Sequence, residues 1–453
     1  MTEGSITKHI VRFALPLLVG NLLQQSYNLV DMIIVGRCIN DGGLSIAAVG
    51  VGGSFIMMMI GLFQGIATGS GIVISNAYGA GRMKRVRKTI RLSLLLSAVM
   101  GVATAAVSIL ICNWILTLLN TTEEIFDLAS LYLRIYFIGF IPLLIYNMGT
   151  SILQALGNSR SPFCYLAVTC VMNIAMDLIF LKGFGMGAEG AALATVLATA
   201  AACGLVLRKI STSGMMKNPD GDGSPEKLDR SRYLLTTIIR YGVPIAIQSL
   251  TMSLSNMILQ GNMNLLGTDA IAAWSIFGKV DGYVIMPVIS FRMAITTFVG
   301  QNFGARRLDR VEESRKVVCR LSVGTVVSLG ILVVLFYKPI VMLFEPSEAV
   351  LDYCRQMVYY MVPFYFTLAF INIYTGLFNG LGKPLMGSAV MILCMCFLRV
   401  LTVSITFPMM HSFMAIVIAY YVSWFSCMFI LLGVYHFYLK KQMGLNRITE
   451  KRL

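Results

Sequence analysis

Residues 92–119 read LSLLLSAVMGVATAAVSILICNWILTLL, a stretch of 28 positions without a charged side chain. About 20 apolar residues in a helix are enough to cross the hydrocarbon core of a bilayer. Further apolar stretches lie at residues 19–35 and 331–337. The chain is 57% hydrophobic and 13% charged, and its mean hydropathy is +0.77. Soluble domains carry about 25% charged residues. The composition therefore predicts an integral membrane protein.

The net charge of +15 raises the question of nucleic-acid binding. Lys and Arg instead gather in short clusters between the apolar stretches, such as residues 82–91 and 306–316, as membrane topology requires. Most of the ten cysteines lie inside apolar stretches and none forms a CxxC pair, so neither a metal site nor a disulfide framework is indicated. We therefore expect the partner of this chain to be a lipid bilayer and not a nucleic acid.

Charged residues, glycines and prolines divide the chain into twelve apolar spans. Their expected limits are residues 10–36, 46–79, 87–119, 125–155, 161–181, 187–207, 234–266, 270–303, 314–344, 349–378, 384–408 and 413–438. Positive charge follows the even-numbered spans and flanks both termini. By the positive-inside rule, this pattern predicts a multi-pass protein of the cytoplasmic (inner) membrane with both termini in the cytoplasm.

Residues 211–232 are polar and rich in Gly and Pro, which is typical of a flexible linker. They separate an N-lobe of residues 1–210 from a C-lobe of residues 233–453. An offset of 225 carries Asn147 onto Asn372 and the pair Ala47-Ala48 onto Ala272-Ala273, so the lobes are repeats. The predicted fold is all-α, with twelve transmembrane helices in two pseudo-symmetric six-helix lobes. Two-lobed transporters bind their substrate in a central cavity between the lobes.

Two acids lie deep in the spans of the N-lobe, where a charge costs about 2.5–3.5 kcal/mol. Asp31 is in the first span, and Asp177 follows Asn173 by four residues in the fifth, so those two share a helix face. Ala191 and Thr195 have the same spacing in the sixth span. All lie roughly 6–12 Å below the outer helix ends. The residues at this depth predict a site for a hard cation or a shared proton, the alternative being hydrogen bonds that only join helices.

A Na⁺ ion would use oxygens of Asp31, Asn173, Asp177 and Thr195, with protonation of the acids competing for the same place. The neutral oxygens favour Na⁺, because a proton site does not require them.

The first span also carries a polar stripe of Asn21, Gln24 and Asn28 that leads to Asp31. Such a stripe faces protein or a watery cavity, because lipid cannot satisfy it. Pro16 frees a backbone carbonyl in this span and predicts a kink, unless it stands in the first helical turn.

The C-lobe does not repeat the acidic site: Asp31 aligns with Leu259, and Asp177 aligns approximately with Arg399. We expect Asp281 to pair with Arg399 or Lys279, either to neutralise charge or to contact substrate. Arg292 adds a further positive charge. Polar side chains in the seventh span line a cavity or form core hydrogen bonds; they are Gln248, Asn256 and Gln260.

Motifs for chemistry are missing from the sequence. Nothing resembles a phosphate-binding P-loop or a nucleophile with its base, so ATP-driven transport and enzyme activity are not expected. No cofactor is expected either, the coupling ion being Na⁺ or H⁺. The 29 methionines suit a pliable cavity for varied hydrophobic guests.

Several motifs resemble those of the multidrug and toxic compound extrusion (MATE) family. The first span, with Leu15-Pro16, Gly20-Asn21, Gln24-Gln25, Tyr27-Asn28 and Asp31, is similar to the opening helix of that family. The likeness continues through residues 47–50, 78–81 and 301–305, and so covers nearly the whole chain.

The resemblance implies a twelve-helix exporter that exchanges amphipathic, often cationic, drugs for H⁺ or Na⁺. In the DinF-like branch the cation-linked residues match Asp31, Asn173, Asp177 and Thr195, and a proline matches Pro16. The acids that the NorM-like branch uses in helices 7 and 10 are missing here, where helix 7 has Gln248 and Gln260 and helix 10 has only Asp352 at its start. We expect a monomer that binds small-molecule drugs. The alternative is a lipid or oligosaccharide flippase of the same fold.

Overall fold

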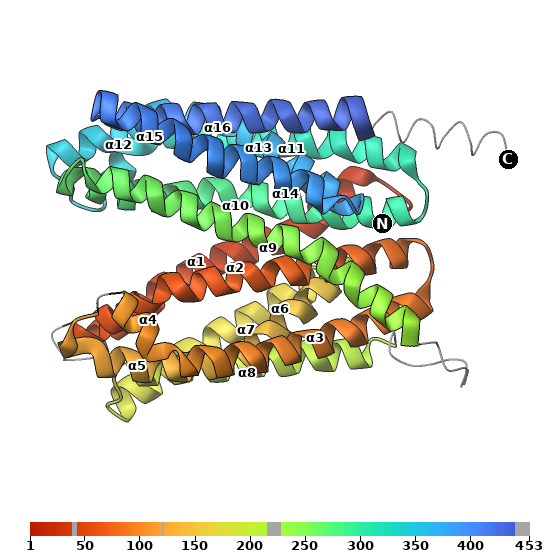
Figure 1. Ribbon diagram of the computed structural model, residues 1–453, viewed down its shortest axis with the longest axis horizontal. Coiled ribbons are helices and arrows are strands. Elements are labelled where there is room, and N and C mark those ends of the chain that lie inside the picture. The colour runs from red at the N-terminus through yellow and green to blue at the C-terminus, as the bar shows by residue number, and fades with distance from the viewer. Residues whose placement is uncertain (39–42, 120, 215–227, 440–453) are drawn as a thin grey trace. The chain divides into compact units, whose positions relative to one another are not determined.

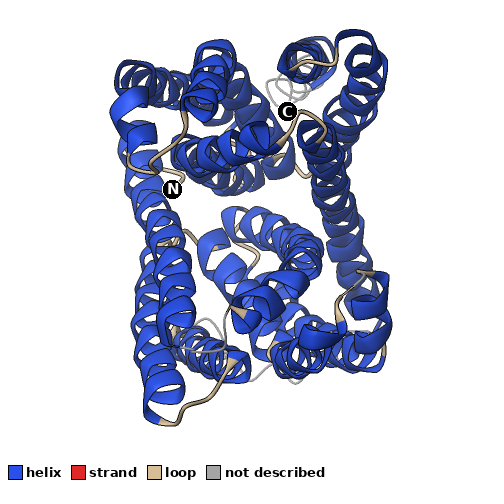
Figure 2. Ribbon diagram, turned by 90° about the vertical axis from the view of Figure 1, so that its left-hand side faces the viewer, coloured by secondary structure: helices blue, strands red, loops and turns tan. Residues whose placement is uncertain are grey.

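The computed structural model describes residues 1–38, 43–119, 121–214 and 228–439. Those residues form helices and loops without a strand (Figure 2). Eleven of the described helices are long and apolar enough to cross a membrane, and one bent pair brings the number to twelve. The predicted all-α transmembrane fold is therefore confirmed. Most of the predicted linker, residues 215–227, lies outside the described part.

The described residues of the first half of the chain form eight α-helices and one π-helix. They are α1 (Ile6–Cys38), α2 (Leu44–Gly79), α3 (Met83–Leu110), α4 (Cys112–Leu118), α5 (Glu123–Ile138), α6 (Phe140–Ala155), α7 (Arg160–Asp177), the π-helix η1 (Leu178–Gly183) and α8 (Ala188–Thr212). The predicted span 125–155 is the bent pair α5–α6, with an angle of 43°. Gly139 stands at the bend, where a β-carbon would lie 2.6 Å from a methyl of Val196.

The second half repeats this order with different interruptions. Its helices are α9 (Leu228–Asn264), α10 (Thr268–Gly304), α11 (Leu308–Met342), α12 (Glu348–Met361), the 3₁₀-helix η2 (Val362–Phe364), α13 (Tyr365–Gly380), α14 (Pro384–Ile392), the π-helix η3 (Leu393–Leu398), α15 (Arg399–Met410), α16 (Phe413–Gly433) and the π-helix η4 (Val434–Leu439). Pro363 lies in η2, where its missing N–H interrupts the span formed by α12 and α13.

Two compact units divide the chain. The N-unit is Leu15–Ala246, and the C-unit joins Met1–Ala14 to Ile247–Leu453. The boundaries fall inside α1 and α9, within two residues of Pro16 and Pro244. The lobe limits expected from the sequence lie at the linker. In the structure, the first part of α1 belongs to the C-unit and the first part of α9 belongs to the N-unit.

Close contacts explain the exchange. In the C-unit, the carbonyl of Met1 accepts hydrogen bonds from Arg310 (3.3 Å) and Asn302 (3.5 Å). In the N-unit, the first half of α9 crosses α2 so tightly that a β-carbon on Gly69 would lie 2.5 Å from the backbone nitrogen of Gly242. Small residues permit such crossings in membranes, where close packing replaces the hydrophobic effect between helices.

The N-unit core lies between α2, α3, α6 and α8, which run side by side (Figure 1). Ile74, Ile90, Ile152 and Val206 are fully buried there. A second cluster joins α2, α4, α5 and α8 around Phe137. This core holds α8 at the place where the candidate site forms.

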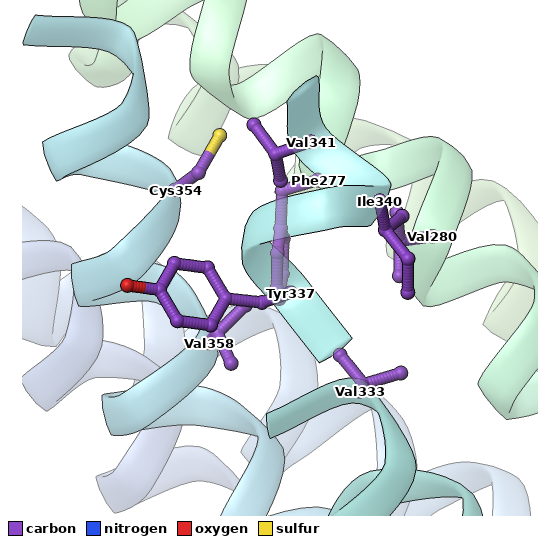
Figure 3. A pocket seen from close by; sticks show the side chains of 8 residues that line it. All are labelled: Phe277, Val280, Val333, Tyr337, Ile340, Val341, Cys354 and Val358. Atoms are coloured by element: carbon purple, nitrogen blue, oxygen red, sulfur yellow. The ribbon is translucent and has the colours of Figure 1, made fainter. Parts of the chain in front are cut away.

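In the C-unit, α10 packs closely against α13. A β-carbon on Gly380 would lie 2.7 Å from Val299, so the helices approach through glycine. The C-unit also encloses a small apolar void between α10, α11 and α12. Figure 3 shows the Tyr337 ring reaching from α11 between Cys354 and Val358 of α12. The void measures about 10 Å³, which is barely room for one water molecule and excludes a substrate.

Candidate functional site

The predicted site residues on α7 and α8 are brought together by a chain of hydrogen bonds. Asn173 Nδ2 donates to Thr195 Oγ1 over 3.2 Å, and Thr195 Oγ1 donates to the carbonyl of Ala191 over 3.0 Å. Asn173 is fully buried. Ala191 thus contributes its backbone oxygen, while its methyl group packs against Val35 and Leu181.

Local structure positions these side chains. Asp177 is the last residue of α7, and the chain continues into the wider turns of the π-helix η1. Single π-helical turns are frequent at functional sites because they shift side chains relative to an α-helix. At the start of α8, the Glu189 carboxylate accepts a hydrogen bond of 2.9 Å from the Gly187 N–H, which fixes the entry into the helix.

The two predicted acids, Asp31 and Asp177, lie next to each other. The carboxyl groups of Asp31 in α1 and Asp177 in α7 lie within hydrogen-bonding reach of each other. Asp177 is fully buried, and Asp31 is half-buried. Because an ionised carboxylate can only accept hydrogen bonds, a bond between two carboxyl groups requires a proton on one of them. This arrangement can therefore hold a shared proton.

Three tyrosines lie near the acids, and the sequence alone assigned none of them a role in the site. The Tyr27 hydroxyl lies within hydrogen-bonding reach of the Thr195 side chain, and its ring precedes Asp31 by one helical turn. Tyr132 and Tyr136 of α5 lie within electrostatic range of Asp31, with their ring centroids 6.0 Å apart. The spacing of four residues between Tyr27 and Asp31 was a usable signal, because it places both on one face. Nothing in the sequence of α5 pointed to Asp31.

The oxygens suit a monovalent ion better than a divalent metal. In the described ranges no group of three or more His, Cys, Asp or Glu side chains could hold a metal ion. The set consists of two carboxyl groups, the Asn173 amide oxygen and the Thr195 hydroxyl. Na⁺ binding there would favour the ionised form of the two carboxyl groups, because Na⁺ takes oxygen lone pairs and not O–H groups.

The polar stripe of α1 lies partly at the surface of the helix. Asn21 is half-buried and Gln24 is exposed, while the side chain of Asn28 lies outside the described residues. Pro16 stands ten residues after the helix start at Ile6 and is therefore interior. The first-turn alternative for Pro16 is wrong, and the carbonyl of Arg12 loses its α-helical hydrogen bond.

The expected ion pair in the C-unit is not formed. Arg399 donates to Ser423 Oγ over 3.1 Å and to Asn256 Oδ1 over 3.4 Å, and its guanidinium lies 4.6 Å from the centre of the Tyr420 ring.

Asp281 instead accepts a hydrogen bond from the Tyr365 hydroxyl. Lys279 lies 5.2 Å from the centre of the Phe344 ring. The prediction that Asp281 pairs with Arg399 or Lys279 is therefore wrong: each of the three groups contacts an aromatic side chain instead, namely Tyr365, Tyr420 and Phe344 respectively.

The polar residues of α9 have separate roles. Gln248 is buried and accepts a hydrogen bond of 2.8 Å from Ser388, so it belongs to the core. Asn256 is exposed apart from its bond to Arg399. Gln260 donates to Asn264 on its own helix over 2.8 Å. These three side chains do not converge on one another.

An apolar groove of about 200 Å³ lies on the C-unit between α11 and α13. Gly330, Val362, Pro363 and Tyr365 are among its lining residues. Ligand pockets usually measure about 300–1,000 Å³ and contain a few converging polar groups. The groove lacks both features and is not the candidate site.

Comparisons with known proteins agree with the fold and the family motifs. The MatE family model matches residues 16–179 and 244–405. The chain is 30% identical over 365 residues to the probable multidrug resistance protein YoeA of Bacillus subtilis, covering 79% of this chain and 77% of that protein. It is 26% identical over 384 residues to the probable multidrug resistance protein NorM of Thermotoga maritima, covering 84% and 81%.

A solved structure is similar over almost its full length. It is an outward-facing multidrug resistance MATE family transporter of the MOP superfamily, with a TM-score of 0.87, 21% identity, and coverage of 99% of this chain and 97% of that one. The twelve-helix fold, the matched family model and the similarity to YoeA lead to one conclusion: this chain belongs to the MatE family and is a membrane transporter, not an enzyme.

Proposed function

We propose that the protein exports amphipathic organic compounds in exchange for a cation that enters at Asp31 and Asp177. The observation that carries this proposal is the meeting of these two carboxyl groups between membrane-spanning helices. Two carboxylates at such a distance cannot both be ionised without a compensating cation, so the site favours one bound positive charge. The names of YoeA and NorM support drug export over the flippase alternative.

We infer that a proton is the occupant when the two carboxyl groups lie this close together. A hydrogen bond between the two carboxyl groups would need one proton and no other ligand. Sodium remains a competitor for the same place, since Asn173 and Thr195 keep oxygen lone pairs beside it. One charge moving inward down 100 mV releases about 2.3 kcal/mol, which supports more than a tenfold gradient of a neutral substrate.

Coupling between cation and substrate depends on how α1 moves when the cation binds or leaves. With the cation bound, α1 is linked to α7 through Asp31 and Asp177. When the cation leaves, the two negative charges repel each other and α1 separates from α7. Pro16 lies fifteen residues before Asp31, at the boundary between the compact units, so α1 can bend there. The bend would transmit occupancy of the site to the substrate.

Purified protein in liposomes tests the proposal. With an imposed pH gradient or Na⁺ gradient, a fluorescent drug should move against its own gradient, and Asp31→Asn should abolish this movement. Asn keeps the size of the side chain but cannot bind and release the cation as a carboxyl group does. Drug movement that needs no ion gradient, or that Asp31→Asn leaves unchanged, would overturn the proposal.

A further inference from the structure

Arg292 carries a charge inside the membrane without a protein partner. Its guanidinium makes no hydrogen bond, ion pair or ring contact with any part of the chain that the structure describes. The side chain is half-buried, and none of its nitrogens is among the fully buried polar atoms. The guanidinium is therefore reachable from outside the C-unit.

Arg292 lies inside the membrane-spanning part of α10, towards its C-terminal end. It lies 24 residues after Thr268 and 12 residues before Gly304, which is about 36 Å and 18 Å from the helix ends. A hydrocarbon core of about 30 Å centred on this helix begins about 12 Å from each end. This places Arg292 about 6 Å inside the core. A guanidinium there avoids the lipid chains and faces water, a lipid headgroup or a polar ligand.

The fold does not require a cation at this position. The repeat offset of 225 places Ala67 of α2 at the equivalent point of the N-unit, where its side chain is buried. The Ala67 carbonyl accepts a hydrogen bond of 2.6 Å from Ser151 of α6, whereas the Arg292 carbonyl accepts one of 2.8 Å from Thr296 of its own helix. The equivalent positions therefore carry a methyl group in the N-unit and a guanidinium group in the C-unit.

The base of the Arg292 side chain is held in place by α13. Thr296 bonds to the carbonyls of both Arg292 and Gly376 (3.1 Å), which ties α10 to α13. A β-carbon on Gly376 would lie 3.1 Å from Arg292 Cγ and 2.8 Å from its carbonyl oxygen, so glycine leaves room for the side chain to pass. The guanidinium thus projects from a rigid support, which favours binding of a ligand.

The charges in the two units have opposite signs. The N-unit site has two carboxyl groups, whereas the C-unit has Arg399 with neutral partners and Arg292 with none in the described ranges. The acid on α10 that is nearest to Arg292 in sequence is Asp281, which accepts a hydrogen bond from the Tyr365 hydroxyl. An acidic group is the ligand that this field attracts, and guanidinium binds carboxylates and phosphates through paired hydrogen bonds.

We propose that Arg292 binds the acidic group of amphipathic anionic substrates. The proposal rests on the exporter function proposed above and names a substrate class for it. Because the coupling cation and the substrate then bind groups of opposite charge, they do not compete for the same carboxyl groups. Exchange between them depends on a change in conformation and not on direct displacement.

Two xanthene dyes of similar shape and opposite charge provide the test: anionic fluorescein and cationic rhodamine 6G. Binding is measured by fluorescence polarisation with the purified full chain, and export is measured in liposomes. Arg292→Gln should weaken fluorescein binding at least tenfold and leave rhodamine 6G binding unchanged. Arg292→Lys should recover part of the loss, since it keeps the charge but not the paired donors. The matched control is Lys279→Gln, which removes an exposed positive charge from the same helix and should change neither dye.

The other outcomes of these assays refute either substrate binding by Arg292 or the exporter function. Equal loss of both dyes in Arg292→Gln, an equal effect of Lys279→Gln, or no fluorescein binding by the wild type overturns the proposal. An anionic lipid headgroup is the other source of such a ligand, so the assay is run in phosphatidylcholine with and without phosphatidylglycerol. Competition of phosphatidylglycerol with fluorescein at a site that Arg292→Gln removes, without fluorescein export, assigns Arg292 to lipid and overturns substrate binding. Arg292-dependent fluorescein binding without export of either dye supports the anion site and refutes the exporter function.

Discussion

Asn173 on α7 and Thr195 on α8 are joined by a hydrogen bond of 3.2 Å, and the Thr195 hydroxyl in turn donates to the carbonyl of Ala191. The bond lies beside Asp177, which is on the same helix face as Asn173 one turn later. The two helices are thereby held at the depth where the carboxyl groups of Asp31 and Asp177 meet. A neutral pair therefore supports the acidic pair, so a substitution at Thr195 is expected to change both stability and ion binding.

Thr195→Val should destabilise the protein and weaken its response to Na⁺. The substitution keeps the side-chain shape but leaves the buried Asn173 amide without its acceptor, which costs about 1–3 kcal/mol of unfolding free energy. Thermal unfolding in detergent measures the first effect. Thr169→Val is the control, because Thr169 bonds only within α7, to the carbonyl of Tyr165, and should change stability by less than about 0.5 kcal/mol. Equal shifts for the two variants would contradict the interpretation.

Neutralising Asp31 or Asp177 should abolish export, whereas Asp352→Asn should leave it largely intact. Asp352 is exposed near the start of α12 and pairs with Arg355 in the next turn, and exposed pairs of this kind contribute about 0–1 kcal/mol. Drug accumulation in cells, corrected for expression, measures the effect. If all three variants lose activity to the same extent, Asp31 and Asp177 are no more important for export than Asp352.

A pH gradient alone should drive drug movement if, as proposed above, Asp31 and Asp177 share a proton. Added Na⁺ should then compete with the proton and slow pH-driven export at low proton concentration. Thr195→Val should need more Na⁺ for the same inhibition, with little change in the pH profile. Liposomes with imposed gradients measure both. Export that follows a Na⁺ gradient and ignores the pH gradient would refute the proton as the occupant.

Pro16→Ala and Pro244→Ala should raise stability and slow export. Proline inside a helix costs about 3 kcal/mol and weakens the helix at one point, and these two prolines lie within two residues of the boundaries between the compact units. Pro408→Ala in α15 is the matched control, because it removes an interior proline far along the chain from either boundary. It should raise stability without slowing export. Normal transport rates in Pro16→Ala and Pro244→Ala would show that bending at these points is not needed.

Both termini should be cytoplasmic. A reporter fused after Leu453 should be active only in the cytoplasm, and one inserted between Thr121 and Thr122 only outside. The physical reason is the concentration of Lys and Arg after the even-numbered spans. Reversed activities would overturn the charge argument and the depth assigned to Asp31 and Asp177.

The sequence by itself determined the membrane class, the twelve spans and the repeat, and it predicted one depth for Asp31, Asn173, Asp177 and Thr195. These properties belong to each helix alone: hydropathy decides whether a segment enters the membrane, and the rise per residue decides how deep a side chain lies.

The tertiary structure decided which side chains meet. It joined Asp281 to Tyr365 and not to Arg399, added Tyr27, Tyr132 and Tyr136 around the acids, and moved the unit boundaries into α1 and α9. These outcomes depend on the rotation and crossing of whole helices, which packing between distant segments sets, such as the approach of Gly69 to Gly242. A span's own sequence shows that a charge needs a partner, and only the neighbouring helix determines which one it finds.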